Sequence, residues 1–235
     1  MLPGIFLRDN KKMANRRNYD KELMQLLEQG ERGKILFLHS CCAPCSSYVL
    51  EYLRSFFRIT VFYYNPNITE EEEYRKRVEE QKRLIVAYNA QISKDGKADA
   101  AFPITIIEGD YAPVSYYETI KGFEQCAEGG ERCFRCYELR LRETARRASL
   151  AKADYFGTTL TISPLKNAEK LNEIGEALAA EYQVAHLPSD FKKRGGYQRS
   201  IVLSAEYDLY RQDYCGCIYS KLEREKAKSD SARKS

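Results

Sequence analysis

The stretch KILFLHSCCAPC, residues 34–45, decides both the fold that we expect and the chemistry that accompanies it. Residues 34–39 form a short continuous apolar run, which is typical of a parallel strand buried on both faces. Three cysteines follow directly. Pro44 then lies in what would be the first turn of a helix, where its missing N–H costs nothing. The stretch therefore predicts a buried strand, a cysteine-rich turn and a helix.

The rest of the chain continues to alternate between strand and helix patterns. We expect further strands over residues 58–64, 104–108, 154–161 and 183–187, and helices over residues 19–28, 44–57, 69–89, 111–126, 133–151, 167–182 and 197–211. This alternation predicts an α/β domain in which a mostly parallel sheet is covered by helices on both faces. Ligands of such sheets bind beyond the carboxyl ends of the strands, and the first three cysteines lie there.

Composition is that of an ordinary globular protein of 235 residues, with 43% hydrophobic and 31% charged residues. We expect an N-terminal extension with one helix over residues 1–32, a single α/β catalytic domain over 33–220, and a disordered basic tail over 221–235. No apolar stretch is long enough to span a membrane, and no signal-peptide pattern is visible. We therefore expect a cytoplasmic protein without a membrane partner.

Net charge is only weak evidence for a nucleic-acid partner. The chain carries a formal charge of +4. Residues 1–34 have eight basic and five acidic side chains and residues 221–235 have six and three, so the body between them carries −2. Any contact with a polyanion must therefore depend on local basic patches.

Cysteines are the most informative residues of the chain. Seven of the eight fall into three tight clusters: Cys41, Cys42 and Cys45; Cys133 and Cys136; Cys215 and Cys217. Cys126 stands alone and is expected to be a small core residue. In a chain of this size without a secretory signal, clustered cysteines indicate metal binding or redox chemistry rather than a disulfide framework.

The first two clusters can supply four thiolates, the number that a cubane iron–sulfur cluster needs. Cys41 and Cys42 would provide two of them, and the CxxC pair Cys133 and Cys136 the other two. Three other interpretations remain open at this point: a zinc site that uses Cys42 and Cys45 as one half, a thioredoxin-type CxxC at the same two residues, and plain buried thiols.

The third cluster, Cys215-Gly-Cys217, differs in its spacing. One intervening residue is tight for two ligands of one metal, but glycine gives the backbone unusual freedom. Such a pair can close a strained, labile disulfide. We interpret it as a redox-active pair, with two structural thiols as the alternative.

Three ordered motifs resemble those of the QueH-type, cobalamin-independent epoxyqueuosine reductases. They are HSCCAPC (39–45), ERCFRCYELRL (131–141), and a third that joins DFKKRGGY (190–197) to YDLYRQDYCGC (207–217). The resemblance covers residues 33–217. It implies a Rossmann-like fold of the adenine-nucleotide α-hydrolase (HUP) type. It also implies removal of the epoxide oxygen of epoxyqueuosine at the tRNA wobble position, giving queuosine.

The resemblance further implies roles for individual cysteines. Cys41, Cys42, Cys133 and Cys136 would hold a [4Fe-4S] cluster, and Cys215 and Cys217 would form a redox-active disulfide. A second metal, iron, is associated with the family next to the cluster, and Cys45 is a candidate ligand for it. Some relatives have a carboxylate where this chain has Cys45, so the ligand set of that second site is open.

Epoxide reduction to an alkene requires two electrons, two protons and the loss of water. We expect the cluster to act as a Lewis acid on the epoxide oxygen, and the Cys215/Cys217 dithiol to supply or relay electrons as it closes to a disulfide. Asp213 or Tyr214 is the expected proton donor. An external electron donor must complete the cycle.

The expected macromolecular partner is a tRNA with a GUN-type anticodon that carries epoxyqueuosine. The basic candidates for contact with it are Lys192, Lys193, Arg194 and Arg199 around a Gly-Gly loop, and Arg132, Arg135, Arg140 and Arg142 beside the second cysteine pair. Phe191 and Tyr197 suit stacking on an unstacked base. A solvated basic face is the alternative. Two other classes remain open for the whole protein, a thiol–disulfide oxidoreductase and a zinc-stabilised RNA-binding module.

Overall fold

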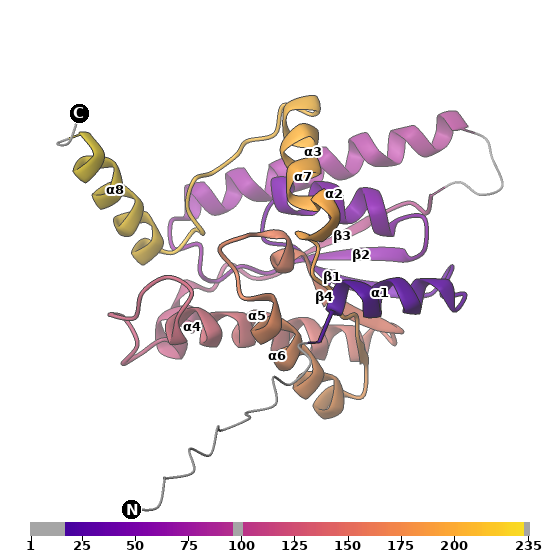
Figure 1. Ribbon diagram of the computed structural model, residues 1–235, viewed down its shortest axis with the longest axis horizontal. Coiled ribbons are helices and arrows are strands. Elements are labelled where there is room, and N and C mark those ends of the chain that lie inside the picture. Colours follow the sequence, from indigo (N-terminus) through magenta and orange to yellow (C-terminus); the bar gives the residue numbers. More distant parts are fainter. Residues whose placement is uncertain (1–16, 96–100, 233–235) are drawn as a thin grey trace, which may run out of the picture.

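A computed structural model describes residues 17–95 and 101–232 (Figure 1). Its centre is a five-stranded, wholly parallel sheet with the strand order β3-β2-β1-β4-β5. The strands are β1 (Ile35–His39), β2 (Arg58–Tyr63), β3 (Thr105–Glu108), β4 (Tyr155–Thr158) and β5 (Ala185–His186). The predicted α/β class with a Rossmann-like parallel sheet is confirmed.

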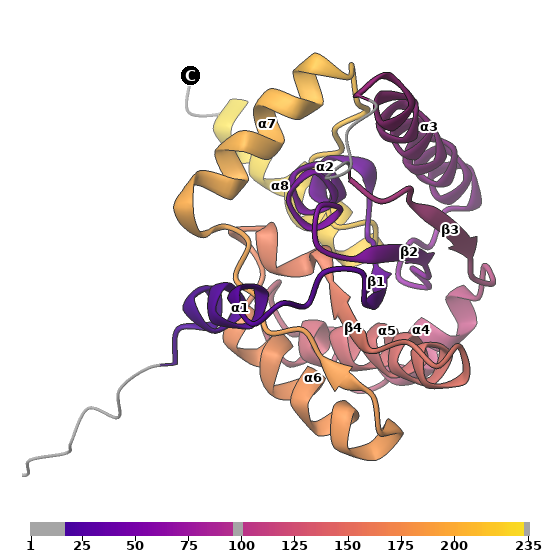
Figure 2. The same ribbon diagram turned by 90° about the vertical axis from the view of Figure 1, so that its right-hand side faces the viewer.

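Helices cover both faces of this sheet (Figure 2). They are α1 (Tyr19–Glu28), α2 (Ala43–Leu53), α3 (Glu71–Asp95), α4 (Pro113–Thr119), α5 (Glu131–Leu150), α6 (Ala168–Tyr182), α7 (Gly196–Glu206) and α8 (Ile218–Ala232), with 3₁₀ turns η1 (Thr159–Ile162) and η2 (Lys193–Gly195). Helices α2, α3 and α7 lie on one side, and α4, α5 and α6 on the other. None of the helices in the described part of the chain is both long and apolar enough to cross a bilayer.

Alternation along β1 divides the core into two layers. Leu36 and Leu38 pack with α2 and α3, whereas Phe37 packs with α5 and α6. Successive side chains of a strand point to opposite faces, so an uninterrupted apolar run is what a strand covered on both sides requires. This confirms the expectation drawn from residues 34–39.

The register between β1 and β4 places the turn at Cys41 and Cys42 beside the end of β4. His39 pairs with Thr158 across the sheet, and its Nδ1 lies 2.9 Å from the Thr158 hydroxyl. Directly beyond, the Cys41 N–H donates to Thr159 Oγ1 at 3.5 Å. Cys42 then caps α2 in an extended conformation, with proline in the first turn as expected. The cysteines therefore lie at the carboxyl edge of the sheet.

Several expected boundaries differ from the structure. The strand expected over 154–161 ends at Thr158 and continues as η1. The helix expected over 111–126 is only α4, because the chain turns at Gly122, whose φ is +86°. The helix expected over 197–211 ends at Glu206.

The disordered tail expected over 221–235 is wrong as far as Ala232, because α8 occupies that region. Two long-range ion pairs fix its beginning: Glu223 with Arg132 at 2.8 Å and Lys221 with Glu70 at 2.6 Å. Beyond this base, α8 stands away from the sheet at the edge of the molecule (Figure 1). Residues 1–16 of the expected extension and 233–235 of the expected tail lie outside the described residues.

Candidate metal and redox centre

Three cysteines at the N-terminus of α2 form a compact group. The Sγ atoms of Cys41, Cys42 and Cys45 all lie within 4.8 Å of one another, and those of Cys41 and Cys42 are 3.8 Å apart. Cys42 is the N-cap residue and Cys45 follows three positions later, so both side chains turn toward the start of the helix. A tetrahedral site with metal–sulfur bonds of about 2.3 Å places its sulfurs about 3.8 Å apart. This group can hold a metal ion.

Mutual hydrogen bonding makes one of these thiols far more acidic than the others. The pKa of Cys42 is lowered by its hydrogen bonds with Cys41 and Cys45. The pKa of Cys45 is raised by its hydrogen bonds with Cys41 and Cys42, and that of Cys41 is raised to about 12, chiefly by Cys42. One thiolate is thus favoured within the group, which is how closely spaced acidic groups behave.

Four further cysteines from two distant segments surround a second, smaller cavity. Cys133 and Cys136 come from the first two turns of α5, and Cys215 and Cys217 from the loop before α8. Cys215 lines both this cavity and the larger one that contains the first group. The structure thus brings seven cysteines into two adjoining spaces, and it divides the four expected cluster ligands between them. Cys126 lies outside both sets of lining residues.

Four buried cations lie among these sulfurs. They are Arg77, Arg132, Arg140 and Lys166, with 2%, 2%, 1% and 8% of their surface exposed. Arg77 pairs with Glu73 at 2.6 Å and Lys166 with Glu128 at 3.0 Å. No carboxylate among residues 17–92 and 101–232 pairs with Arg140, and its buried Nη2 has no hydrogen-bond partner among them. A buried charge without a counter-charge is costly, so this position calls for a negative group.

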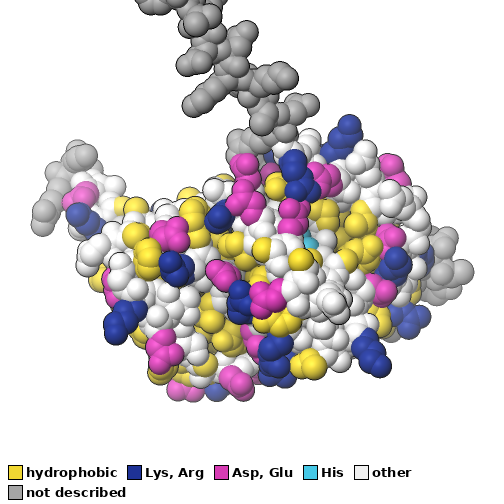
Figure 3. Space-filling view, turned by 90° about the horizontal axis from the view of Figure 1, so that it is seen from below, with side chains coloured by type: hydrophobic (Ala, Val, Ile, Leu, Met, Phe, Trp, Pro, Cys, Tyr) yellow, Lys and Arg dark blue, Asp and Glu magenta, His cyan; other side chains and the backbone are white. Residues whose placement is uncertain are grey.

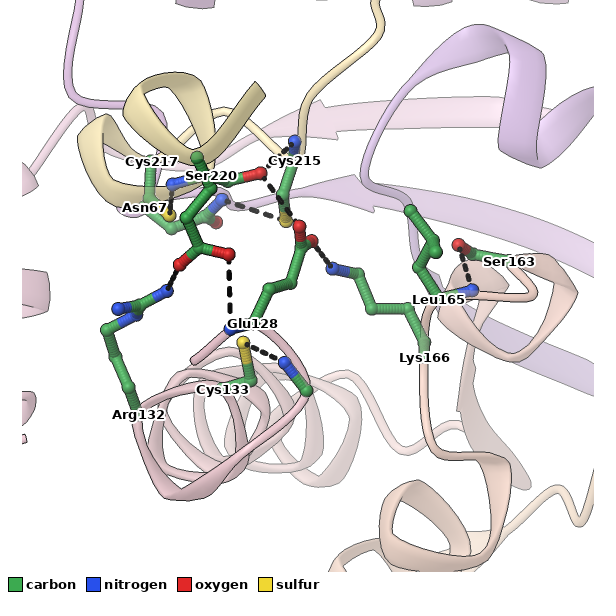
Figure 4. A network of polar contacts seen from close by, with 12 residues as sticks. Asn67, Glu128, Arg132, Cys133, Ser163, Leu165, Lys166, Cys215, Cys217 and Ser220 are labelled. Carbon is green, nitrogen blue, oxygen red and sulfur yellow. Dashed lines mark hydrogen bonds and ion pairs between the residues drawn. The ribbon is translucent and has the colours of Figure 1, made fainter. Parts of the chain in front are cut away.

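Serine 220 organises the loop that carries Cys215 and Cys217 (Figure 4). Its Oγ accepts from the Cys215 N–H at 3.1 Å and donates to Glu128 at 3.2 Å. Its own N–H donates to Cys217 Sγ at 3.4 Å. Cys217 therefore caps α8 in the manner of a serine or aspartate. Gly216, between the two cysteines, has a φ of +120°, which only glycine adopts readily.

The two thiols of this loop differ in acidity. Burial alone would raise the pKa of Cys215, but the charges of Lys166 and Arg140 outweigh burial and the pKa is lowered. The pKa of Cys217 is raised by burial and by the neighbouring Cys215. Thiol–disulfide exchange needs one thiolate to attack, and Cys215 is the residue prepared for it.

A cavity of about 890 Å³ opens beside the cysteines. Its inner wall is formed by the first cysteine group, Arg77, Lys166 and Cys215, and its outer wall by residues 211–214 and one face of α8. Tyr197 and Tyr214, two of the expected site residues, line it as well. A cavity of this size accommodates a ligand of several hundred Å³.

Asp213 and Tyr214 occupy different environments. Asp213 lines the cavity but pairs with Lys228 at 2.5 Å, and this partner lowers the pKa of its carboxyl. Tyr214 has a pKa raised by burial, and the Arg77 guanidinium lies 5.1 Å from its ring centre. Of the two expected proton donors, only Tyr214 keeps its proton near neutral pH.

Most of the basic residues expected at a tRNA surface have protein partners. Lys192 binds Asp190 at 2.7 Å, Arg194 binds Asp20 at 3.1 Å, and Arg199 binds Glu51 at 2.5 Å.

Arg135 stacks over Phe123, with its guanidinium 4.1 Å from the ring centre. Arg132 and Arg140 are buried, and Arg142 pairs with Glu138 and Glu181. Phe191 belongs to the core. Lys193 lies in η2.

Charge is also dispersed on one face of the molecule (Figure 3). On the face seen from below in Figure 3, acidic and basic side chains alternate rather than gather into one basic patch. The basic residues that line the large cavity are therefore the more informative ones: Arg77, Lys166, Arg211, Arg224 and Lys228.

Sequence reasoning missed four residues of the centre: Arg77, Glu128, Lys166 and Ser220. All four lie outside the cysteine motifs, and the neighbours of the three charged residues do not predict their burial. Ser220 alone carries a weak hint, because it follows the N-cap position by three residues, as in a capping box.

Comparison with known proteins yields one consistent family. A family model described as Epoxyqueuosine reductase QueH matches residues 36–223. Three proteins named Epoxyqueuosine reductase QueH are similar to the chain. One from Streptococcus pyogenes is 41% identical, covering 86% of this chain and 78% of that protein. One from Staphylococcus epidermidis is 41% identical, with 91% and 89% covered. One from Thermotoga maritima is 33% identical, with 86% and 97% covered.

Proposed function

The chain belongs to the Epoxyqueuosine reductase QueH family and is an oxidoreductase of queuosine biosynthesis, and we propose that it works on tRNA at the cysteine centre described above. The observation that carries the proposal is the convergence of three distant cysteine segments beside an open cavity at the carboxyl edge of the sheet. The substrate is epoxyqueuosine at the wobble position of a tRNA with a GUN-type anticodon, and the product is queuosine. The thiols need a reducing compartment, which supports the expected cytoplasmic location.

Cys41, Cys42, Cys133 and Cys136 are the proposed ligands of a [4Fe-4S] cluster, and Cys45 the proposed ligand of an adjacent iron. The donor set is soft and thiolate-rich, as such groups require. The partnerless Nη2 of Arg140 supports an anionic occupant, because Arg140 lies in the field of Cys41, Cys136 and Cys215. When bound, the cluster supplies electrons one at a time, and the iron supplies a Lewis acid.

The chain's own residues supply two electrons and two protons. With Cys215 as the thiolate, oxidation of the Cys215/Cys217 pair to a disulfide releases two electrons and the proton of Cys217, and Tyr214 gives the second proton, so the epoxide is converted to an alkene and water. Solvent then returns a proton to the Tyr214 phenolate. Cys215 lines the substrate cavity as well as the inner one, so it is in place to pass electrons between them. An external electron donor then reduces the disulfide.

Tyr214 is the proposed donor of a proton to the departing oxygen. It lines the cavity, and burial holds its pKa above the usual value. Arg77 faces its ring and would stabilise the phenolate that remains after transfer. Tyr197 lines the same cavity and offers a ring for stacking on a base.

Purification without oxygen, followed by iron and sulfide analysis, tests the proposal. We expect a brown protein that absorbs at ~400 nm and turns over epoxyqueuosine-containing tRNA. The variant C136S should lose iron, whereas the matched variant C126S, at the cysteine outside both cavities, should keep it. Stoichiometric zinc without iron would indicate the RNA-binding module, and a colourless protein with a measurable disulfide potential would indicate the thiol–disulfide oxidoreductase.

A further inference from the structure

Helix α8 presents one face to the substrate cavity. Arg224, Ala227, Lys228 and Ser231 line the cavity, and their spacing of three and four residues is that of a single helical face. Family resemblance does not account for this face, because the family match ends at residue 223. The cavity wall thus includes residues that the family match leaves unassigned.

Two polar groups on this outer wall lack partners. The Nε of Arg224 and the Oε1 of Gln212 are both buried, and neither has a hydrogen-bond partner among the described residues. No carboxylate in the described ranges forms an ion pair with Arg224. The guanidinium of Arg224 lines the cavity without an ion-pair partner among the described residues, so an anionic ligand there would supply one.

The outer wall also carries an excess of positive charge. Arg211, Arg224 and Lys228 line it, with Asp213 as the one carboxylate. Asp213 is already paired with Lys228. A ligand on this wall would therefore need at least one negative charge to match it.

Residues farther along α8 line parts of the cavity that lie farther from the cysteines. Ser220 lies at the base of the helix, where it holds Cys215. With a rise of about 1.5 Å per residue, Arg224 lies ~6 Å and Lys228 ~12 Å farther along the axis. The two basic side chains of α8 therefore line the part of the cavity that lies farther from Cys215.

We propose that α8 is the phosphate-binding wall of the substrate cavity, in which Arg224 binds a phosphodiester of the tRNA anticodon loop next to the modified nucleotide. Lys228 releases Asp213 and binds a second phosphate in its place. This inference rests on the proposed function, since it takes the same cavity as the site of the same tRNA. It assigns residues that lie beyond the family match.

Binding of an anticodon stem-loop hairpin with a GUN anticodon tests the role of Arg224. The variant R224Q should bind at least about tenfold more weakly, as loss of a charged hydrogen bond predicts. Its plot of log affinity against log salt should be shallower by ~0.7, the contribution of one single-stranded phosphate. With modified tRNA, KM should rise while kcat stays unchanged, because the lost contact is equally present in the ground and transition states.

K226Q is the matched control. Lys226 is an exposed residue of the same helix that does not line the cavity, so the variant removes the same charge from the other face. Thermal unfolding of both variants shows whether α8 remains folded. Equal losses in R224Q and K226Q, or no loss in R224Q, would overturn the inference while the function stands. A wild-type protein that neither binds the hairpin nor turns over modified tRNA would instead contradict the proposed function itself.

Discussion

Replacing Gly216 by alanine is the sharpest test of how the redox loop is built. The φ of Gly216 is +120°, and a Cβ there would lie 2.7 Å from Ile68 Cγ1 and 3.2 Å from Arg77 Nη1. The backbone strain costs a non-glycine residue ~1–3 kcal/mol, and relief of the clash costs a further ~1–3 kcal/mol. G216A should therefore destabilise the protein by roughly 2–6 kcal/mol.

A second glycine separates these two contributions. Gly122 also has a positive φ, +86°, but a Cβ there would meet nothing within 4 Å. G122A should thus cost only the strain of ~1–3 kcal/mol. The remaining difference between the variants corresponds to about 2–12 °C in Tm for a chain of this size. Calorimetry of both variants, reduced and metal-free, measures it. If G216A unfolds at or above the Tm of G122A, the close packing of the redox loop against Ile68 is refuted.

Two further variants probe the dithiol. C217S keeps an oxygen in place of the sulfur that caps α8, so it should retain the helix and the bound iron yet lose multiple turnovers; full turnover would contradict the electron relay. K166M removes the cation that lowers the pKa of Cys215, so the Cys215 thiolate loses stabilisation. Alkylation of Cys215 in the reduced, metal-free variant should therefore require a higher pH than in the wild type. Mass spectrometry quantifies that alkylation, and superimposable pH profiles would remove Lys166 from the account of Cys215 acidity.

Local patterns were sufficient to predict the framework of the fold. The apolar run of residues 34–39 predicted β1, and the proline in the following turn predicted the start of α2. Because parallel strands end at one edge of a sheet, the location of Cys41, Cys42 and Cys45 followed from the same pattern. The positions of all these elements depend on neighbours in the chain, which a sequence displays directly.

Features that depend on remote partners could not be predicted in this way. The composition of residues 221–235 is that of a disordered segment, and nothing nearby shows that Glu223 pairs with Arg132. The basic loop at 192–194 was expected to face tRNA because the sequence shows its positive charges and does not show their remote partners. Asp190 and Asp20 neutralise Lys192 and Arg194 there, and the partner of Arg194 is 174 residues away in the sequence.

The buried cations link the chemistry of the centre to its stability. Seven thiols would be mostly protonated if burial alone set their pKa values, and Arg140 would then stand in the interior with no counter-charge. Removing protons from thiols next to Arg140 and Lys166 supplies that counter-charge, and a metal holds the resulting thiolates together. Binding of an anionic metal group should therefore be coupled to folding of the start of α5, which carries Cys133, and of the loop that carries Cys215. The sheet, whose core contains no ionised group at β1, can form without it. The same charges that make Cys215 acidic thus also favour the state in which the centre is loaded.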